Sequence, residues 1–228
     1  MDADETLRTQ RRYNRQAALY DLREAPVELM FRRFRRWLWS GVSGRFVLEV
    51  GVGTGKNFAH HPAEARVVGI DLSPRMLRRA ARRARRLGRQ IDLIVADAQQ
   101  LPFRDGAFDA AAASFVFCSV PDAVAGLEQV RRVVSKAGEI HLLEHVRARN
   151  RLVGWFMDRL NPVVVRMRGA NINRDTVSNV ARAGIAIDGV ESRGFGIIKL
   201  IRGSKDRIRP VGASAEETGP LDARKGTA

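Results

Sequence analysis

Five short apolar runs alternate with helix-like segments along most of this chain, and that alternation limits the possible folds more than any other feature. The runs are RFVLEV, RVVGID, IDLIVAD, FDAAAASFVF and GEIHLLEH. Such alternation is typical of a mostly parallel sheet with helices on both faces. A last segment, IAIDGVESRGFGIIKLIRG, predicts two strands joined by a turn. With 228 residues, 45% of them hydrophobic, the chain can form one α/β domain, whose seven-stranded sheet ends in an antiparallel hairpin.

Two helices between the runs carry clear end signals. In SPRMLRRAARRARRLG, Ser73 can cap the N-terminus, Pro74 suits the first turn and Gly88 can end the helix. In DAVAGLEQVRRVVSK, Asp122 is the expected cap. The inner stripe of the first helix is predicted to contain Met76, Leu77, Ala80, Ala81, Ala84 and Leu87, and that of the second Leu127, Val130, Val133 and Val134.

The first apolar run passes into a glycine-rich turn, VLEVGVGTGKNF, residues 47–58. A phosphate-binding GxxxxGK[ST] loop would need glycine in place of Val50 and a hydroxyl in place of Asn57. A dinucleotide-binding GxGxxG turn would need glycine in place of Lys56. The spacing of the glycines therefore excludes both phosphate-binding patterns.

What remains is Glu49-x-Gly51-x-Gly53-x-Gly55 with Thr54 inside the turn, a strand followed by a bare backbone that lets a ligand come close. This spacing is typical of a binding site for S-adenosylmethionine, which carries no phosphate. The turn alone does not show where the rest of that ligand would bind. The residues at the ends of the following strands are needed to predict those contacts.

Acidic residues follow the second and third runs. In an open parallel sheet, ligands bind outside the carboxyl ends of the strands, where the strand order reverses. We expect Asp71 to accept both ribose hydroxyls of an adenosine group and Leu72 to pack on its adenine. We expect Asp97 to accept from the adenine amino group, with Ala98 and Gln99 beside it. A single acid after a strand is more often a helix cap or a solvated loop residue, so the prediction depends on the strand ends taken together.

The segment SFVFCS follows the fourth run and is expected to line the side of the site that faces the methyl group. The candidate cofactor-binding residues are therefore Glu49, Gly51, Gly53, Thr54, Gly55, Asp71, Leu72, Met76, Asp97, Ala98, Gln99 and Phe115.

Together these segments resemble the class I S-adenosylmethionine-dependent methyltransferases over residues 13–202. Residues 49–55 match the first motif, GIDLSPRML the second, DAQQLPF the third and FDAAAASFVF the fourth. Within this superfamily the chain resembles the ubiquinone and menaquinone methyltransferases. It is more similar to bacterial phosphatidylethanolamine N-methyltransferases and to membrane-associated thiol methyltransferases, and this closer resemblance rests on the segments FVFCSVPD, EIHLLEHVR and GANINRDT. It departs from the family at VVSKAGE, where Lys-Pro-Gly-Gly is usual. The resemblance implies a Rossmann-like fold and S-adenosyl-L-methionine as cofactor.

Methyl transfer from a sulfonium requires an aligned acceptor and a route for the acceptor's proton. Glu144 and His145, which end the fifth run, are the candidate catalytic residues, and His145 has the side chain suited to act as a base. The alternative role for His145 is a supporting hydrogen bond or a helix cap. Cys118 is expected to be a small buried packing residue rather than a nucleophile. The four histidines and the single cysteine lack metal-ligand spacing, so no metal is predicted.

The net charge of +15, from 40 basic and 25 acidic side chains, predicts an anionic partner unless it reflects an arginine-rich genome. RNA is the less favoured partner: the helix at 75–89 carries eight arginines, but no RNA-binding module is present. A membrane surface is favoured by PVELMFRRFRRWLW, residues 26–39, and by RLVGWFMDRLNPVVVRMRG, residues 151–169, which both join aromatic and aliphatic residues to arginines. The alternative is that both segments pack over the cofactor.

The helix predicted at residues 26–39 has an apolar side and a basic side. Its apolar positions at helical spacing are Val27, Met30, Phe31, Phe34 and Leu38, and the arginines expected on its other side are Arg32, Arg33, Arg35 and Arg36.

We expect one methyltransferase domain over residues 1–203, with a helical lid at 1–44, a lid insertion at 151–173 and a disordered tail at 204–228. Within that insertion, Asn171 and Asn173 are expected to order the loop over the pocket, unless Asn173 caps the helix that begins RDTVSNVARAG.

The lone cysteine, the lack of an apolar run of about 20 residues and an N-terminus without an apolar centre predict a cytoplasmic protein, peripheral on the inner membrane face. The expected acceptor is an amphiphile, first of all a phospholipid headgroup amine of the phosphatidylethanolamine type. A thiol or a quinone precursor is the alternative, and RNA a distant one.

Overall fold

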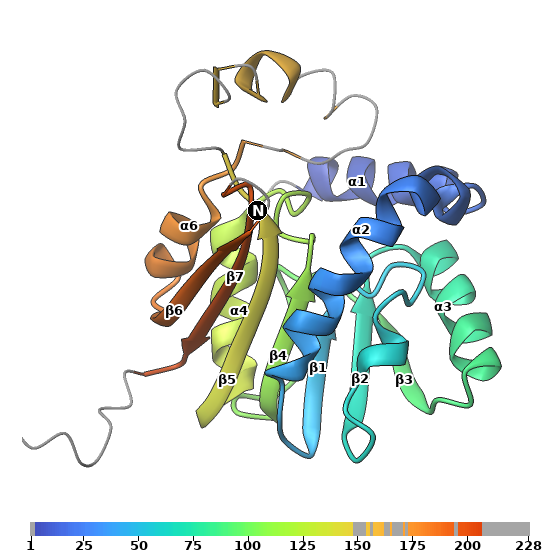
Figure 1. The fold of residues 1–228 in the computed structure, drawn as a ribbon. Coiled ribbons are helices and arrows are strands. Elements are labelled where there is room, and N and C mark those ends of the chain that lie inside the picture. The colour runs from blue at the N-terminus through green and yellow to red at the C-terminus, as the bar shows by residue number, and fades with distance from the viewer. Residues whose placement is uncertain are drawn as a thin grey trace, which may run out of the picture.

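The computed structural model describes residues 3–147, 154–155, 157–161, 165, 171, 173–193 and 196–206. One seven-stranded sheet lies at the centre, in the order β3-β2-β1-β4-β5-β7-β6 (Figure 1). β1 to β5 pair in parallel, and β7 runs antiparallel to both β5 and β6. The predicted fold class, a mostly parallel sheet that ends in an antiparallel hairpin, is therefore confirmed. The strands are β1 Phe46–Val50, β2 Arg66–Asp71, β3 Ile91–Val95, β4 Phe108–Ser114, β5 Val134–His145, β6 Ala186–Arg193 and β7 Ile198–Ser204.

Helices cover both faces of this sheet. α2 and α3 pack on one face, where Ile91 contacts the apolar clusters of both, and α4 and α6 pack on the other. α1 lies across the end of the sheet at which the parallel strands finish (Figure 1). The helices are α1 Ala3–Gln16, α2 Tyr20–Ser40, the short 3-10 helix η1 Phe58–His60, α3 Pro74–Arg86, α4 Ala123–Val133 and α6 Thr176–Arg182.

Strand β5 shows why both faces are apolar. Leu142 packs in the cluster that contains Leu127 of α4, whereas the next residue, Leu143, packs in the cluster that contains Phe34 and Leu38 of α2. Successive side chains of a strand point to opposite faces, so a central strand between two helical layers is apolar at consecutive positions. The two consecutive leucines of HLLEH are therefore explained by burial on both faces of the sheet.

The end signals of the two predicted helices are confirmed, with two corrections. The Oγ of Ser73 accepts from the amide of Met76 at 3.1 Å, and Asp122 accepts from the amide of Ala125 at 3.0 Å. The sequence predicts Leu87 on the inner stripe of α3, but Leu87 follows the last helical residue and is 44% exposed. It also predicts Val134 inside α4, but Val134 begins β5.

The early end of α4 is explained by contacts with β4 and with the segment after β7. Val134 is fully buried and pairs with Phe108 at the start of β4. The ammonium of Lys205 donates to the carbonyls of Arg132 and Val134, each at 3.2 Å, and so satisfies groups that a continuing helix would have used itself.

The sheet reverses its strand order between β1 and β4, which are neighbours although β2 and β3 lie between them in the chain. The glycine turn after β1 and the segment after β4 therefore lie side by side at the carboxyl ends of the strands. This is the position at which open parallel sheets bind their ligands.

The last strand ends one residue beyond the domain boundary expected at 203. Ser204 is buried and pairs with Ala186 of β6. The rest of the predicted tail, residues 207–228, lies outside the described residues, as does most of the predicted insertion at 151–173. The division of the chain into one domain and a tail stays a prediction.

Candidate active site

A cavity of about 920 Å³ lies where the parallel strands finish, beneath α1 and α2. Its lining includes the last residues of β1, β2, β4 and β5 and the residues that follow β3. Three predicted cofactor residues, Glu49, Gly55 and Gln99, do not line it. The other nine do: Gly51, Gly53, Thr54, Asp71, Leu72, Met76, Asp97, Ala98 and Phe115.

The glycine turn requires glycine for two different reasons. Gly51 and Gly53 have φ angles of +66° and +55°, in the left-handed region. A Cβ on Gly51 would lie 2.5 Å from a methyl carbon of Val116, whereas a Cβ on Gly53 would meet nothing within 4 Å. Gly51 therefore allows close packing against the segment after β4, and Gly53 leaves backbone open to the cavity.

Replacing Gly51 with alanine is expected to lower the free energy of unfolding by about 3 kcal/mol, from the backbone conformation and the clash with Val116 together. Gly88 is the matched control, because its φ is +63° and a Cβ there meets nothing within 4 Å. Gly88→Ala should cost only about 1 kcal/mol. Equal losses in denaturant titrations of the two variants would show that contact with Val116 does not constrain the turn.

Asp71 connects the glycine turn to the start of α3. One carboxylate oxygen accepts from the amide of Gly53 at 2.8 Å, and the other accepts from the amide of Ser73 at 2.8 Å. Burial, and to a smaller extent the charge of Glu49, raises the pKa of Asp71 to about 6, against the lowering effect of the two amide bonds. At neutral pH the cavity wall thus carries a desolvated carboxylate whose remaining lone pairs suit a pair of hydroxyl donors.

Asp97 lines the cavity, whereas Gln99 is buried and holds it in place. The carboxylate of Asp97 accepts from the backbone amide of Gln99 at 2.9 Å and from its side-chain amide at 3.1 Å. The same side-chain amide donates to Thr6 of α1, and its oxygen accepts from the amide of Asp122 at 3.0 Å. Gln99 therefore links α1 and the start of α4 to Asp97 and does not line the cavity itself.

Glu49 is fully buried and begins a polar network that the sequence did not predict. Its oxygens lie 2.6 Å from Nδ2 of Asn57 and 2.8 Å from Nε2 of His61. Arg35 of α2 donates to the side-chain oxygens of Asn57 at 3.2 Å and of Ser114 at 2.9 Å. Glu49 therefore supports the cavity wall from behind, through Asn57.

Arg35 corrects the expected arrangement of α2. The helical pattern predicts Arg35 on the outward side with the other arginines, but Arg35 is buried and lines the cavity. Its Nε lies 2.9 Å from a carboxylate oxygen of Glu28, which also pairs with Lys56 at 2.9 Å. A buried guanidinium is retained when such partners satisfy it, and helical periodicity cannot reveal partners that come from other elements.

Helices α1 and α2 supply cavity residues that the motifs missed. Tyr13 and Tyr20 line it together with Arg23 and Glu24. The Tyr13 hydroxyl lies 2.7 Å from the Ser119 hydroxyl, and burial raises the pKa of both tyrosines, so both stay neutral donors at physiological pH. The sequence did offer a signal: they are the chain's two tyrosines, and they lie seven residues apart.

Of the two predicted catalytic residues, His145 lines the cavity and Glu144 does not. His145 lines the cavity, with ring centroids 4.6 Å from Phe115 and 5.3 Å from Phe31. Burial lowers the pKa of His145 to about 4, so its imidazole is neutral at physiological pH. Glu144 is fully buried, does not line the cavity, and has a pKa that burial raises to about 7.

The carboxylate of Glu144 holds the turn that presents Phe115. One oxygen accepts from the amides of Val116 and Phe117, at 2.9 and 3.0 Å. Phe115 has a φ of +57°, a strained value for a non-glycine residue that must be maintained by its surroundings. Glu144 therefore positions the aromatic wall of the cavity, and it touches no space that a ligand would occupy.

The remaining single-residue predictions have mixed outcomes. Cys118 is buried and lines the cavity, and burial raises its pKa to about 12, so it stays a protonated thiol that packs. The backbone amide of Asn171 donates to the carbonyl of Cys118 at 2.9 Å; most of the loop that it was expected to order lies outside the described residues, so that role stays a prediction. Asn173 does not cap α6; Asp175 does, by accepting from the amide of Ser178 at 3.2 Å.

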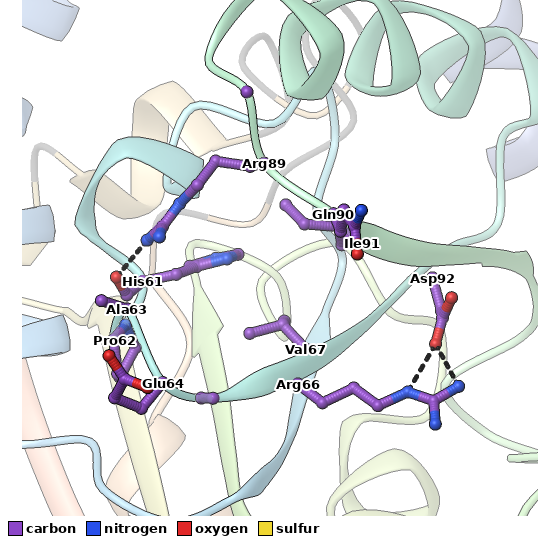
Figure 2. A pocket seen from close by; sticks show the side chains of 12 residues that line it. His61, Pro62, Ala63, Glu64, Arg66, Val67, Arg89, Gln90, Ile91 and Asp92 are labelled. Atoms are coloured by element: carbon purple, nitrogen blue, oxygen red, sulfur yellow. Dashed lines mark hydrogen bonds and ion pairs between the residues drawn. The ribbon is translucent and has the colours of Figure 1, made fainter.

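A second hollow of about 600 Å³ lies at the opposite end of the sheet, where β2 and β3 begin (Figure 2). Arg66 and Asp92 form an exposed ion pair at one side of it, and Arg89 donates to the carbonyl of His61 at another (Figure 2). None of the predicted site residues lines this hollow, so it is separate from the cavity above.

Within the parts of the chain that the structure describes, no group of three histidine, cysteine or acidic side chains is placed to hold a metal ion. Among the same residues, no helix is both long and apolar enough to cross a bilayer.

Comparisons with known proteins agree with this geometry. A family model described as a methyltransferase domain matches residues 47–138. The ubiquinone/menaquinone biosynthesis C-methyltransferase of Citrifermentans bemidjiense is 39% identical over 140 residues, which cover 56% of this chain but only 59% of that protein. The phosphatidylethanolamine N-methyltransferase of Cereibacter sphaeroides is 33% identical over 147 residues, 64% of this chain and 70% of that protein.

Among solved structures, the fold is similar to that of an S-adenosylmethionine-dependent methyltransferase from Thermotoga maritima, described as a possible histamine N-methyltransferase. The TM-score is 0.69 at 19% identity, and the match covers 87% of this chain and 100% of that one. At that identity the similarity concerns the fold alone.

Proposed function

This chain belongs to the class I S-adenosylmethionine-dependent methyltransferases, and from that premise we propose that it methylates the headgroup amine of a phosphatidylethanolamine-type lipid at a membrane surface. Its cofactor is S-adenosyl-L-methionine. The acceptor, the docking at a membrane and the roles of single residues are the parts that we propose.

The described residues fit that cofactor. Asp71 presents an ionised, partly desolvated carboxylate suited to the ribose diol, and Leu72 and Asp97 line the same cavity where the adenine would lie. The open backbone at Gly53 leaves room for the methionine part. When bound, the cofactor supplies an activated methyl group, so this chain has only to orient the acceptor, exclude water and release the acceptor's proton.

The observation that carries the proposed acceptor is the neutral imidazole of His145 beside the rings of Phe31 and Phe115. An unprotonated imidazole nitrogen can accept a hydrogen bond from an amine and direct its lone pair. Aromatic faces attract the positive charge that a methylated amine carries. Because a group with a pKa of about 4 is a weak base, we assign His145 to orienting the amine, with the proton leaving to water, rather than to the base role expected from the sequence.

The cavity also suits an amphiphilic acceptor. Arg23 is exposed and lines the cavity, so it can pair with the phosphodiester of a lipid headgroup. Val27 and Phe31, on the same helix, add apolar surface to the lining. A headgroup that reaches inward past α2 would thus meet a cation first and the aromatic wall afterwards.

A quinone precursor is the second candidate acceptor. It is favoured by the C-methyltransferase of ubiquinone and menaquinone biosynthesis at 39% identity, and a flat ring could stack on Phe115. A small thiol remains a further alternative. RNA is less favoured, because the chain shows no RNA-binding module and two of the eight arginines at 75–89, Arg79 and Arg83, pair with Asp21 of α2 at 3.2 and 3.0 Å.

Transfer of labelled methyl from S-adenosylmethionine tests the acceptor. The protein is incubated in parallel with anionic liposomes that contain phosphatidylethanolamine, with demethylated quinols and with small thiols, and the products are extracted and separated. Label in mono- or dimethylated phosphatidylethanolamine is the expected result. Label only in a quinol or thiol product would contradict the proposed acceptor.

His145→Phe is expected to lower kcat for the lipid amine about tenfold, because it keeps a ring against Phe115 but removes the hydrogen-bond acceptor. Cofactor affinity should change little, since the contacts proposed for the ribose and the adenine, at Asp71, Leu72 and Asp97, do not involve His145. His60→Phe on η1, outside the cavity lining, is the control. An unaltered kcat in His145→Phe would remove His145 from the acceptor site.

A further inference from the structure

Helix α2 separates its charges between two sides. Its three acidic residues, Asp21, Glu24 and Glu28, all lie on the side that faces the protein. Asp21 accepts from the Thr54 hydroxyl at 2.6 Å and pairs with arginines of α3, and Glu28 pairs with Arg35. Glu24 lines the cavity. The outward side of α2 therefore carries no carboxylate of its own.

The same outward side exposes large apolar side chains. Leu22 is 73% exposed and Leu29 80%, while Leu19, immediately before the helix, is 50% exposed and Met30 48%. At 100° per residue the three positions inside the helix, Leu22, Leu29 and Met30, fall within an arc of about 100°. With Leu19 just before the helix, they give α2 an exposed apolar stripe, unlike the scattered exposed residues of an ordinary surface.

Arginines accompany this stripe. Arg23 lies beside its first half, and Arg32, Arg33 and Arg36 are exposed on the turns that follow. An exposed surface of leucine, methionine and arginine without acidic residues is complementary to the headgroups and upper acyl chains of an anionic bilayer. We define the docking face as Leu19, Leu22, Leu29 and Met30 with Arg23, Arg32, Arg33 and Arg36.

We propose that the docking face binds the interfacial region of an anionic lipid bilayer and so brings the mouth of the cavity to the lipid. The continuity of α2 supports this: Arg23 belongs to the docking face and lines the cavity, and Val27 lines the cavity from the next turn. The proposal deepens the proposed function and rests on it for its biological purpose, but docking itself needs no methyl acceptor.

Except for Met30, the apolar residues of the docking face are not the ones that the sequence pattern indicated. Phe31, Phe34 and Leu38, the predicted membrane-facing stripe, are buried against the sheet, and only Met30 of that stripe is exposed. The helix thus has two apolar sides. The broader one packs on the protein, and the narrower one is open to solvent.

Vesicle sedimentation of the full chain tests the docking face. Vesicles of phosphatidylcholine are compared with vesicles that also contain phosphatidylglycerol, at increasing salt. The wild type should bind the anionic vesicles preferentially and lose binding as salt rises. Leu22→Glu with Leu29→Glu should weaken the partition at least tenfold. Substitution of Arg32, Arg33 and Arg36 by glutamine should abolish the preference for anionic vesicles.

Two controls separate docking from folding and from chemistry. Leu87→Glu introduces one such charge at an exposed leucine just after α3 and should leave vesicle binding unchanged. Cofactor affinity, measured by calorimetry, should be the same in every variant, because none of the substituted residues is among the proposed cofactor contacts.

The outcomes divide clearly. Vesicle binding that survives the double leucine substitution would overturn the docking face, and so would binding to RNA with none to vesicles. If lipid amine in detergent is methylated but vesicles are not bound, the proposed acceptor is supported and membrane binding by the docking face is contradicted. If vesicles are bound through these leucines but no lipid amine is methylated, membrane binding by the docking face is supported and the proposed acceptor is contradicted.

Discussion

Asp71→Ala is expected to weaken the binding of S-adenosylmethionine about a hundredfold or more. The carboxylate has one lone-pair direction on each oxygen engaged by the amides of Gly53 and Ser73, and its other lone pairs remain for the ribose hydroxyls. A hydrogen bond to a charged group contributes about 1.5–3 kcal/mol, so the loss of two accounts for a factor of about 100 or more. Calorimetric titration of cofactor into each protein measures this change.

The control for this variant is Asp92→Ala. Asp92 lies on the neighbouring strand but at the other end of the sheet, where it forms an exposed ion pair with Arg66 (Figure 2). An exposed pair of this kind contributes little to stability, and it lies far along the sheet from the cavity. Affinity that falls equally in both variants, or in neither, would contradict the assignment of the ribose to Asp71.

Cofactor affinity should also depend on pH through the same residue. The pKa of Asp71 is raised to about 6, so protonation begins to remove the charged acceptor as the pH falls through 6. Because the ribose hydroxyls favour the ionised form, wild-type affinity should fall below pH 6 and reach a plateau above pH 7. In Asp71→Ala this dependence should be lost.

Glu144→Ala is expected to lower the free energy of unfolding by about 3 kcal/mol and to remove most methyl transfer. The change leaves the buried amides of Val116 and Phe117 without their acceptor, each at a cost of about 1–3 kcal/mol. It also releases the strained turn that holds Phe115 against His145. Denaturant unfolding and the methyl-transfer assay measure the two effects.

Glu144→Gln separates positioning from charge. The glutamine oxygen can accept from the same two amides, so most of the stability and activity should return. Glu128→Ala, an exposed carboxylate on α4, should change stability by less than about 0.5 kcal/mol. If Glu144→Ala unfolds like the wild type and still transfers methyl groups, the turn at Phe115 does not depend on Glu144.

Local patterns in the sequence were enough to predict the sheet, its final hairpin and the N-caps of α3 and α4. A strand that is covered on both faces is apolar along its length, so it can be recognised in the sequence. Ser73 and Asp122 can be recognised as caps because each accepts from an amide in the first turn of its own helix. The glycine turn and Asp71 were predictable for the same reason, since the end of a parallel strand fixes where its next residues lie.

The parts that could not be predicted depend on contacts between distant segments. Arg35 faces inward because Glu28, Asn57 and Ser114 surround it, and two of these belong to other elements. Tyr13 reaches the cavity because α1 lies across the sheet end (Figure 1). Glu144 and His145 alternate as strand residues should, but only the turn at Phe115 decides which of them meets the cavity.

The most direct test of the site is a crystal structure of the protein with S-adenosylhomocysteine. We predict electron density in the cavity beneath α1 and α2, with the ribose hydroxyls on Asp71, the adenine between Leu72 and Asp97, and the sulfur directed toward Phe115 and His145. Density for the ligand elsewhere, for example in the hollow between His61 and Asp92, or a ribose that does not contact Asp71, would contradict this account.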